Sequence, residues 1–202
     1  RDCLLSRGLG DVYKRQVKKG YRFTEFPLDY QKRSGLGSYV DRLDKLLYGD
    51  EYQKDIGLGI DVKVYDDIQD LERWMNDCHN STSSAKYYAS YCWAWKSRRN
   101  PTELDIKIPE INPVFQKQWN PWDDQYRWYL DSIDKVGCIY TAQGLGFDYV
   151  GFIWSDDLVW RKNHWEENIQ LVTKFDSQLR GSINANTNKL DLLLNIYRVM
   201  LT

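Results

Sequence analysis

The sequence has few of the residues that bind metal ions. It contains two histidines, His79 and His164, and four cysteines that are scattered without Cys-x-x-Cys spacing. Zinc sites need nitrogen or sulfur ligands at short, characteristic spacings. No metal site is therefore expected, and the cysteines are interpreted as buried free thiols of a reducing compartment.

Long apolar stretches are also missing. The chain has no run of about 20 apolar residues that could cross a bilayer, and no secretory signal pattern. These absences predict a soluble, cytoplasmic protein without a membrane partner. With 202 residues, 42% of them hydrophobic, the chain can form one domain with a sizeable core.

The chain as a whole lacks an excess of positive charge: it has 28 basic and 29 acidic residues. Residues 1–16 resemble translated sequencing-adapter sequence, so they are interpreted as an artefact, with a disordered basic arm as the alternative. Without their four basic and two acidic residues, 24 basic and 27 acidic residues remain, a net charge of −3. Any nucleic-acid binding must therefore rest on a local groove.

The phosphate-binding loop of ATPases, G-x-x-x-x-G-K-[ST], does not occur, and the dipeptide Gly-Lys is absent. This loop supplies the backbone cradle and the lysine that hold the β- and γ-phosphates. The chain alone is therefore not expected to hydrolyse ATP. The acid pair Asp50–Glu51 faintly suggests a Walker B element, but a solvated turn explains it better.

Strand-like and helix-like segments alternate along the chain, which is the pattern of an α/β sheet. Helices are predicted after caps at Ser38, at Asp66 or Asp67, and at Thr187. Strands are predicted at residues 61–65, 86–93, 106–108, 136–140 and 149–154. Residues 157–182 are ambiguous, and an inserted loop with one helix is expected there.

The last two predicted strands are continuous apolar runs, which are typical of strands buried on both faces. The turn between them would place Thr141, Gln143 and the backbone of Gly144 at the edge where open α/β sheets bind ligands. A tight turn between two buried strands is the alternative explanation for the glycines.

Three basic residues, Lys96, Arg98 and Arg99, directly follow Trp93 and Trp95. Basic groups interleaved with aromatic ones can bind single strands through phosphate attraction and base stacking. Alternate strand positions face one side, so the tryptophans fit a core equally well. The pattern favours core tryptophans followed by a solvated basic turn, with a binding surface as the other interpretation.

Several motifs resemble, in order and spacing, those of the Schlafen-group-3-like DNA/RNA helicase family of superfamily 1. Residues 141–150 (TAQGLGFDYV) resemble helicase motif V, and residues 194–202 resemble the opening of motif VI. The upstream similarities are at residues 91–97, 105–110 and 119–120. The resemblance, which covers residues 23–202, implies a mostly parallel sheet flanked by helices. This would be the second RecA-like lobe of a P-loop helicase, truncated and formed by residues 17–202.

The resemblance also implies residue roles. Gln31 and Arg33 resemble the Gln-Phe-Arg element of helicase motif IV, so Arg33 would be the catalytic arginine that reaches the γ-phosphate across an interlobe cleft, and Gln31 would take part in ATP coupling. An ordinary surface arginine is the alternative explanation for Arg33. Thr141 would contact the nucleic-acid backbone, and Gln143 and Gly144 would couple that contact to ATP.

The sequence departs from the family at Lys32, where an aromatic is usual, and at Gly146, where a glutamate is usual. These departures put base stacking and nucleotide coupling at those positions in doubt. Arg198, near the end of the chain, would be a helix or interlobe contact.

The function implied is that of a fragment of an ATP-dependent DNA or RNA helicase or translocase. The intact parent would use ATP and Mg²⁺, with a P-loop lobe supplied upstream, and the fragment would be inactive alone. The main rival is a non-catalytic module whose nine Trp and fifteen Tyr bind single-stranded nucleic acid or carbohydrate. A glycosidase using Asp156 and Asp157 is disfavoured, because adjacent residues on a strand face opposite ways.

Overall fold

The computed structural model describes residues 37–49, 62–82, 84–109, 113–120, 133–142, 145–175, 180–181, 183 and 187–202. Its strands are β1 (Ala85–Ala89), β2 (Ile106–Ile108), β3 (Phe115–Trp119), β4 (Lys135–Gly137), β5 (Tyr149–Ile153), β6 (Leu158–Arg161) and β7 (His164–Glu167). Its helices are α2 (Gly37–Tyr48), α3 (Ile68–Thr82), α4 (Ile139–Ala142), α5 (Ile169–Phe175) and α7 (Lys189–Leu201). None of the described helices is both long and apolar enough to cross a membrane.

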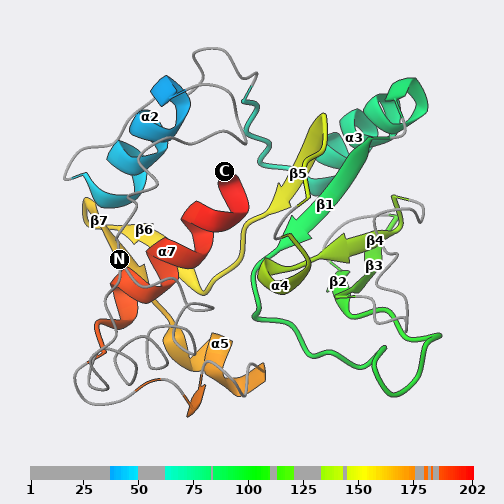
Figure 1. The fold of residues 1–202 in the computed structure, drawn as a ribbon. Helices are drawn as coiled ribbons and strands as arrows, with labels where there is room; N and C mark the ends of the chain where they lie inside the picture. Colours follow the sequence, from blue (N-terminus) through cyan, green and yellow to red (C-terminus); the bar gives the residue numbers. More distant parts are fainter. Residues whose placement is uncertain are drawn as a thin grey trace, which may run out of the picture.

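Five strands form a mostly parallel sheet in the order β2-β3-β4-β1-β5 (Figure 1). β1 pairs in parallel with β4 and β5, β3 pairs in parallel with β4, and β2 joins the edge antiparallel to β3. The predicted α/β class, with a mostly parallel sheet flanked by helices, is therefore confirmed. The arrangement is compatible with a RecA-like lobe.

β1 is the centre of the sheet, and all five of its residues are buried. α3 packs against β1 and β5 on one face, where a Cβ atom on Gly151 would come within 2.9 Å of the Met75 sulfur and of the Tyr87 ring. Only a glycine therefore permits this close packing. On the opposite face, Leu145 and Phe147 pack against Tyr88.

A second core joins α2, α5, α7 and the β6–β7 hairpin, which Figure 1 shows beside the sheet. Leu43 and Leu47 of α2, and Leu193 and Tyr197 of α7, are fully or almost fully buried in it. α2 and α7 are also connected by a hydrogen bond from the Tyr39 hydroxyl to the Leu201 carbonyl, at 2.8 Å.

The three long helices were predicted from their apolar faces and caps, but the predicted cap Ser38 lies inside α2, which begins at Gly37. Asp67 caps α3, since its side chain accepts a 2.8 Å hydrogen bond from the Gln69 amide. At α7 the cap is Asn188, one residue after the predicted Thr187, and its side chain accepts from the Asp191 amide. The short strand predicted at residues 106–108 is β2.

Several strand predictions are wrong in part. Residues 62–65, the described part of a predicted strand, form no strand, and β1 ends at Ala89 rather than at residue 93. β4 ends at Gly137 because α4 begins two residues later. β5 is not buried on both faces: it is an edge strand of the described sheet, and the Val150 side chain is 40% exposed.

Two β elements were not predicted. β3 lies in a proline-bounded stretch, and its alternating polar residues gave no continuous apolar signal. The β6–β7 hairpin lies in the stretch described as ambiguous. Its two-residue turn is formed by Lys162 and Asn163, both with positive φ, at 48° and 66°. Positive φ at both central residues is the geometry of the tight hairpin turn that matches strand twist.

Candidate nucleic-acid interface

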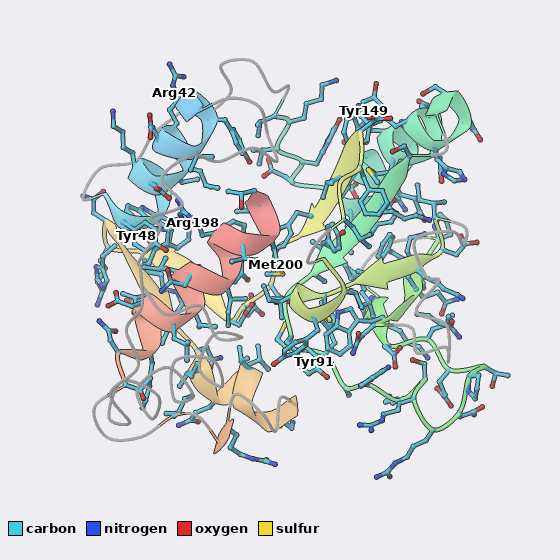
Figure 2. All side chains as sticks on the ribbon, in the orientation of Figure 1. Arg42, Tyr48, Tyr91, Tyr149, Arg198 and Met200 are labelled. Atoms are coloured by element: carbon cyan, nitrogen blue, oxygen red, sulfur yellow. The ribbon has the colours of Figure 1, made fainter. Side chains whose placement is uncertain are left out.

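A hollow of about 550 Å³ opens beyond the carboxyl end of β1. Tyr91, labelled in Figure 2, lies two residues after β1 and forms part of its wall. Four cationic side chains line it, Lys96, Arg98, Arg99 and Lys174, together with one acid, Glu103. The hollow therefore combines four positive charges with one negative charge, in a chain whose net charge is −1.

The structure brings the four predicted nucleic-acid-binding residues of this segment, Trp95, Lys96, Arg98 and Arg99, to one place. Lys174, which completes the set, comes from α5 and was not predicted. No signal in the sequence connects it to residues 96–99, because only the packing of α5 brings it there.

A tight turn concentrates three of the cations. The amides of Arg99 and Asn100 both donate to the Lys96 carbonyl, at 3.0 and 3.2 Å, and the Lys96 amide donates to the Ala94 carbonyl at 2.9 Å. The side chains of Lys96, Arg98 and Arg99 are exposed. These residues, 96–99, are called the basic turn below.

Trp95 supports the basic turn. Its ring contacts Trp119 edge to face, with centroids 6.4 Å apart, and the Arg98 guanidinium lies 5.1 Å from the Trp95 ring centroid. Trp93 and Trp95 both pack against the sheet core. The geometry thus agrees with core tryptophans followed by a solvated basic turn. A base could stack on the Arg98 side of Trp95 only by displacing the guanidinium.

Thr141 lies in α4 rather than on a turn between two strands. Its hydroxyl donates to the Cys138 carbonyl at 3.1 Å and accepts from the Cys138 amide at 2.7 Å. The side chain therefore closes the β4–α4 junction, and its one O–H donor is already engaged. Gln31, Arg33, Gln143 and Gly144 lie outside the described residues, and their roles stay predictions.

Arg198 contacts a neighbouring helix. Its guanidinium holds the Asp44 carboxylate of α2 with two nitrogens, one of them 3.0 Å from Oδ2 (Figure 2). The hydrogen bond to Asp44 raises the pKa of Arg198. Asp44 thus gives Arg198 a local partner within the chain.

A buried polar cluster lies between the two cores, and the sequence gave no sign of it. Asp157 is fully buried, and its Oδ1 accepts from the Tyr197 hydroxyl at 2.7 Å and from the Ser90 hydroxyl at 3.0 Å. Burial raises the pKa of Asp157. Burial also raises the pKa of the adjacent Cys92 to about 12, so this cysteine is a thiol at neutral pH.

Two further interpretations can be compared with the structure. Cys78, Cys92 and Cys138 are buried free thiols, as predicted. Asp156 is exposed whereas Asp157 is buried, so the two cannot flank one glycosidic bond. They lie on the turn between β5 and β6, not on a strand as the sequence argument assumed.

Residues 9–202 match the family model for the Schlafen group 3, DNA/RNA helicase domain. The matched range starts within the first sixteen residues, which themselves lie outside the described part of the chain. No curated protein and no solved structure matches the chain.

Proposed function

The chain belongs to the Schlafen group 3 DNA/RNA helicase domain family, and from this premise we propose that the hollow beyond β1 binds the sugar-phosphate backbone of single-stranded nucleic acid. One observation carries the proposal: three exposed cations of the basic turn and Lys174 of α5 surround a single hollow. It lies at the carboxyl end of a parallel strand, where open α/β sheets bind ligands.

The chemistry of the hollow favours phosphate over base recognition. Lysine and arginine attract phosphate groups irrespective of sequence, and each phosphate neutralised releases counterions. The ring of Trp95 already contacts Trp119 and Arg98, so base stacking is not its main use. Binding of this kind fits an enzyme that must hold any sequence as it moves along a strand.

We expect the triple variant Lys96→Ala, Arg98→Ala, Arg99→Ala to bind a labelled mixed-sequence oligonucleotide at least about tenfold more weakly at low salt. The slope of log K against log salt is negative, and its magnitude should decrease by about 2. Each phosphate contact to a single strand contributes about 0.7 to that magnitude, and the variant loses three cations. Fluorescence anisotropy measured over a series of salt concentrations gives both quantities. Comparing DNA with RNA oligonucleotides in the same series tests the preference between them.

The matched control removes three exposed cations elsewhere, through Lys45→Ala, Arg161→Ala and Lys189→Ala. It makes the same change in net charge on α2, β6 and α7. If both triple variants lose the same affinity, the attraction is a property of overall charge, and the proposal is wrong.

The proposal extends to the family's ATP-driven activity. Arg33, Gln31, Gln143 and Gly144 would couple strand binding to ATP in a protein that also supplies a phosphate-binding loop. Among the described residues, no group of His, Cys, Asp or Glu is arranged to hold a metal ion. ATP turnover by the purified chain would contradict the expectation that it is inactive alone.

The rival proposal, an aromatic carbohydrate-binding module, has less support. Such modules are usually all-β, whereas this chain has a mostly parallel sheet flanked by helices. Many of its aromatic side chains pack in the two cores.

A further inference from the structure

Asp105 is a buried carboxylate that fastens the basic turn to the sheet. It stands immediately before β2 and is 8% exposed. Its Oδ1 accepts hydrogen bonds from the amides of Lys96 and Ser97, at 2.7 and 2.8 Å. Its Oδ2 accepts from the amide of Trp119, at the end of β3, at 2.9 Å.

These three hydrogen bonds fix the start of the basic turn. Two successive backbone amides that converge on one oxygen form an anion-binding nest, here filled by a side chain of the same chain. Bonds to an ionised acceptor are stronger than neutral ones. The Asp105 amide also donates to the Lys117 carbonyl at 3.1 Å, which holds Asp105 itself against β3.

We propose that Asp105 is a positioning residue for nucleic-acid binding: it holds the backbone from which Lys96, Arg98 and Arg99 extend, so that their charges converge on the hollow. The inference rests on the proposed function, since it assigns a role in that binding. It also gives a physical role to the first residue of segment 105–110, one of the segments that resemble the helicase family.

The expected effect has the opposite sign to simple electrostatics. Asp105 is an acid close to a cluster of cations, so neutralising it would by charge alone strengthen the binding of an anion. If Asp105 acts by holding the turn, neutralising it weakens binding, because the cations no longer converge. The direction of the change therefore distinguishes the two roles.

The experiment is Asp105→Asn, tested with the same labelled oligonucleotide over the same salt series. The amide preserves shape but presents an N–H₂ group where an acceptor is needed. We expect affinity to fall at least about fivefold at low salt. The magnitude of the salt slope should decrease by about 0.7, which corresponds to the loss of one phosphate contact. Affinity equal to or tighter than that of the unmodified protein would overturn the proposal.

A matched control separates positioning from general loss of stability. Asp44→Asn also neutralises a carboxylate that accepts charge-assisted hydrogen bonds, but it lies on α2 in the other core. It should lower the melting temperature without changing affinity or salt slope. If its salt slope falls as that of Asp105→Asn does, the slope reports general destabilisation, and the positioning role is refuted.

Two further measurements keep the test decisive if Asp105→Asn fails to fold. Asp105→Glu preserves the charge but lengthens the side chain, and it should also weaken binding. In the unmodified protein, the amide hydrogens of Lys96 and Ser97 should exchange slowly although the turn is exposed. Rapid exchange of both would refute the anchoring role without any variant.

The failure of this inference is distinguishable from failure of the proposed function. If the triple variant of the basic turn binds like the unmodified protein, the hollow is not the binding site. If the triple variant loses affinity while Asp105→Asn retains it, the hollow binds nucleic acid, but Asp105 does not position the basic turn for that binding.

Discussion

The two cores treat positive charge differently. Around the helical core, cations lie next to acids of the same chain: Arg198 is held by Asp44, and Arg161 lies 3.9 Å from Glu166. Beyond the sheet, Lys96, Arg98 and Arg99 converge on a hollow in which Glu103 is the one acid among the described lining residues. The ion pairs on α2, α7 and the β6–β7 hairpin thus connect parts of the chain, whereas the basic turn, together with Lys174 of α5, gathers cations around the hollow for which we propose a ligand.

One of the two buried lysines among the described residues of the sheet, Lys117, supports this distinction. Lys117 is 5% exposed, and its ammonium lies 3.1 Å from Glu72 and about 5 Å from the Tyr87 and Phe115 rings. Glu72 thus neutralises Lys117, as buried charges require. The exposed charges of the basic turn are therefore not a general feature of this half of the molecule.

The most direct test of this difference is to truncate one buried side chain in each core and to measure stability and oligonucleotide binding for both variants. Trp119→Ala removes a fully buried side chain of the sheet, and Leu193→Ala removes one of the helical core. We expect losses of about 3–5 and 2–5 kcal/mol in the free energy of unfolding. Below the melting temperature, only Trp119→Ala should also weaken oligonucleotide binding, because it removes the support of Trp95.

Urea unfolding followed by circular dichroism gives the stability, and anisotropy gives the affinity. Weakened binding in folded Leu193→Ala would show that binding depends on the helical core for more than the Lys174 side chain of α5. The division between the two regions would then be wrong.

A second test concerns the junction between the cores, where Asp157 contacts Ser90 after β1 and Tyr197 of α7. Burial raises the pKa of Asp157 in the folded state, so the folded protein binds its proton more tightly than the unfolded chain does. Stability from this group is therefore fully present below the unfolded pKa and is lost as pH rises through the folded pKa. Each unit of pKa difference is worth about 1.4 kcal/mol.

Asp157→Asn removes this titration while preserving an oxygen that can accept from both hydroxyls. The stability difference between variant and unmodified protein should shift in favour of the variant as pH rises from 4 to 7. Unfolding free energies measured across that range test it. If the difference in unfolding free energy between the variant and the unmodified protein is constant with pH, the pKa of Asp157 is not raised in the folded state, and the prediction is wrong.

The sequence predicted the elements whose signals are local. α2, α3 and α7 were found because their apolar residues recur at helical spacing, and β2 because a short apolar pattern stands alone between prolines. β3 was missed because Lys117 looks exposed in the sequence. Its burial depends on Glu72 of α3 and the Tyr87 ring of β1, which are distant in sequence, as well as on Asp134 and the neighbouring Phe115 ring.

In the site, too, local features were predicted and contacts between separate segments of the chain were not. The basic turn was predicted because its cations are neighbours in sequence, whereas the structure adds two residues that lie outside the turn. Lys174 arrives from α5, and Asp105 acts on backbone amides, which every residue carries. Thr141 was placed on a turn because a four-residue helix is too short to leave an apolar period.

The smallest expected effect is at the ion pair between α2 and α7. Arg198→Lys preserves the charge but loses the planar fork that grips Asp44 with two nitrogens. Both side chains are about one-third exposed, at 30% and 33%, so solvent screens the pair. We expect a loss of about 0.5–1 kcal/mol, with oligonucleotide binding unchanged. A double-mutant cycle with Asp44→Asn isolates the pair, and a coupling energy near zero would mean that apolar packing and the Tyr39–Leu201 hydrogen bond join the two helices without a contribution from the ion pair. A change in binding would instead show that charge on α2 and α7, and not only Lys174 of α5, contributes to ligand binding, which is the outcome most damaging to the contrast between the two regions.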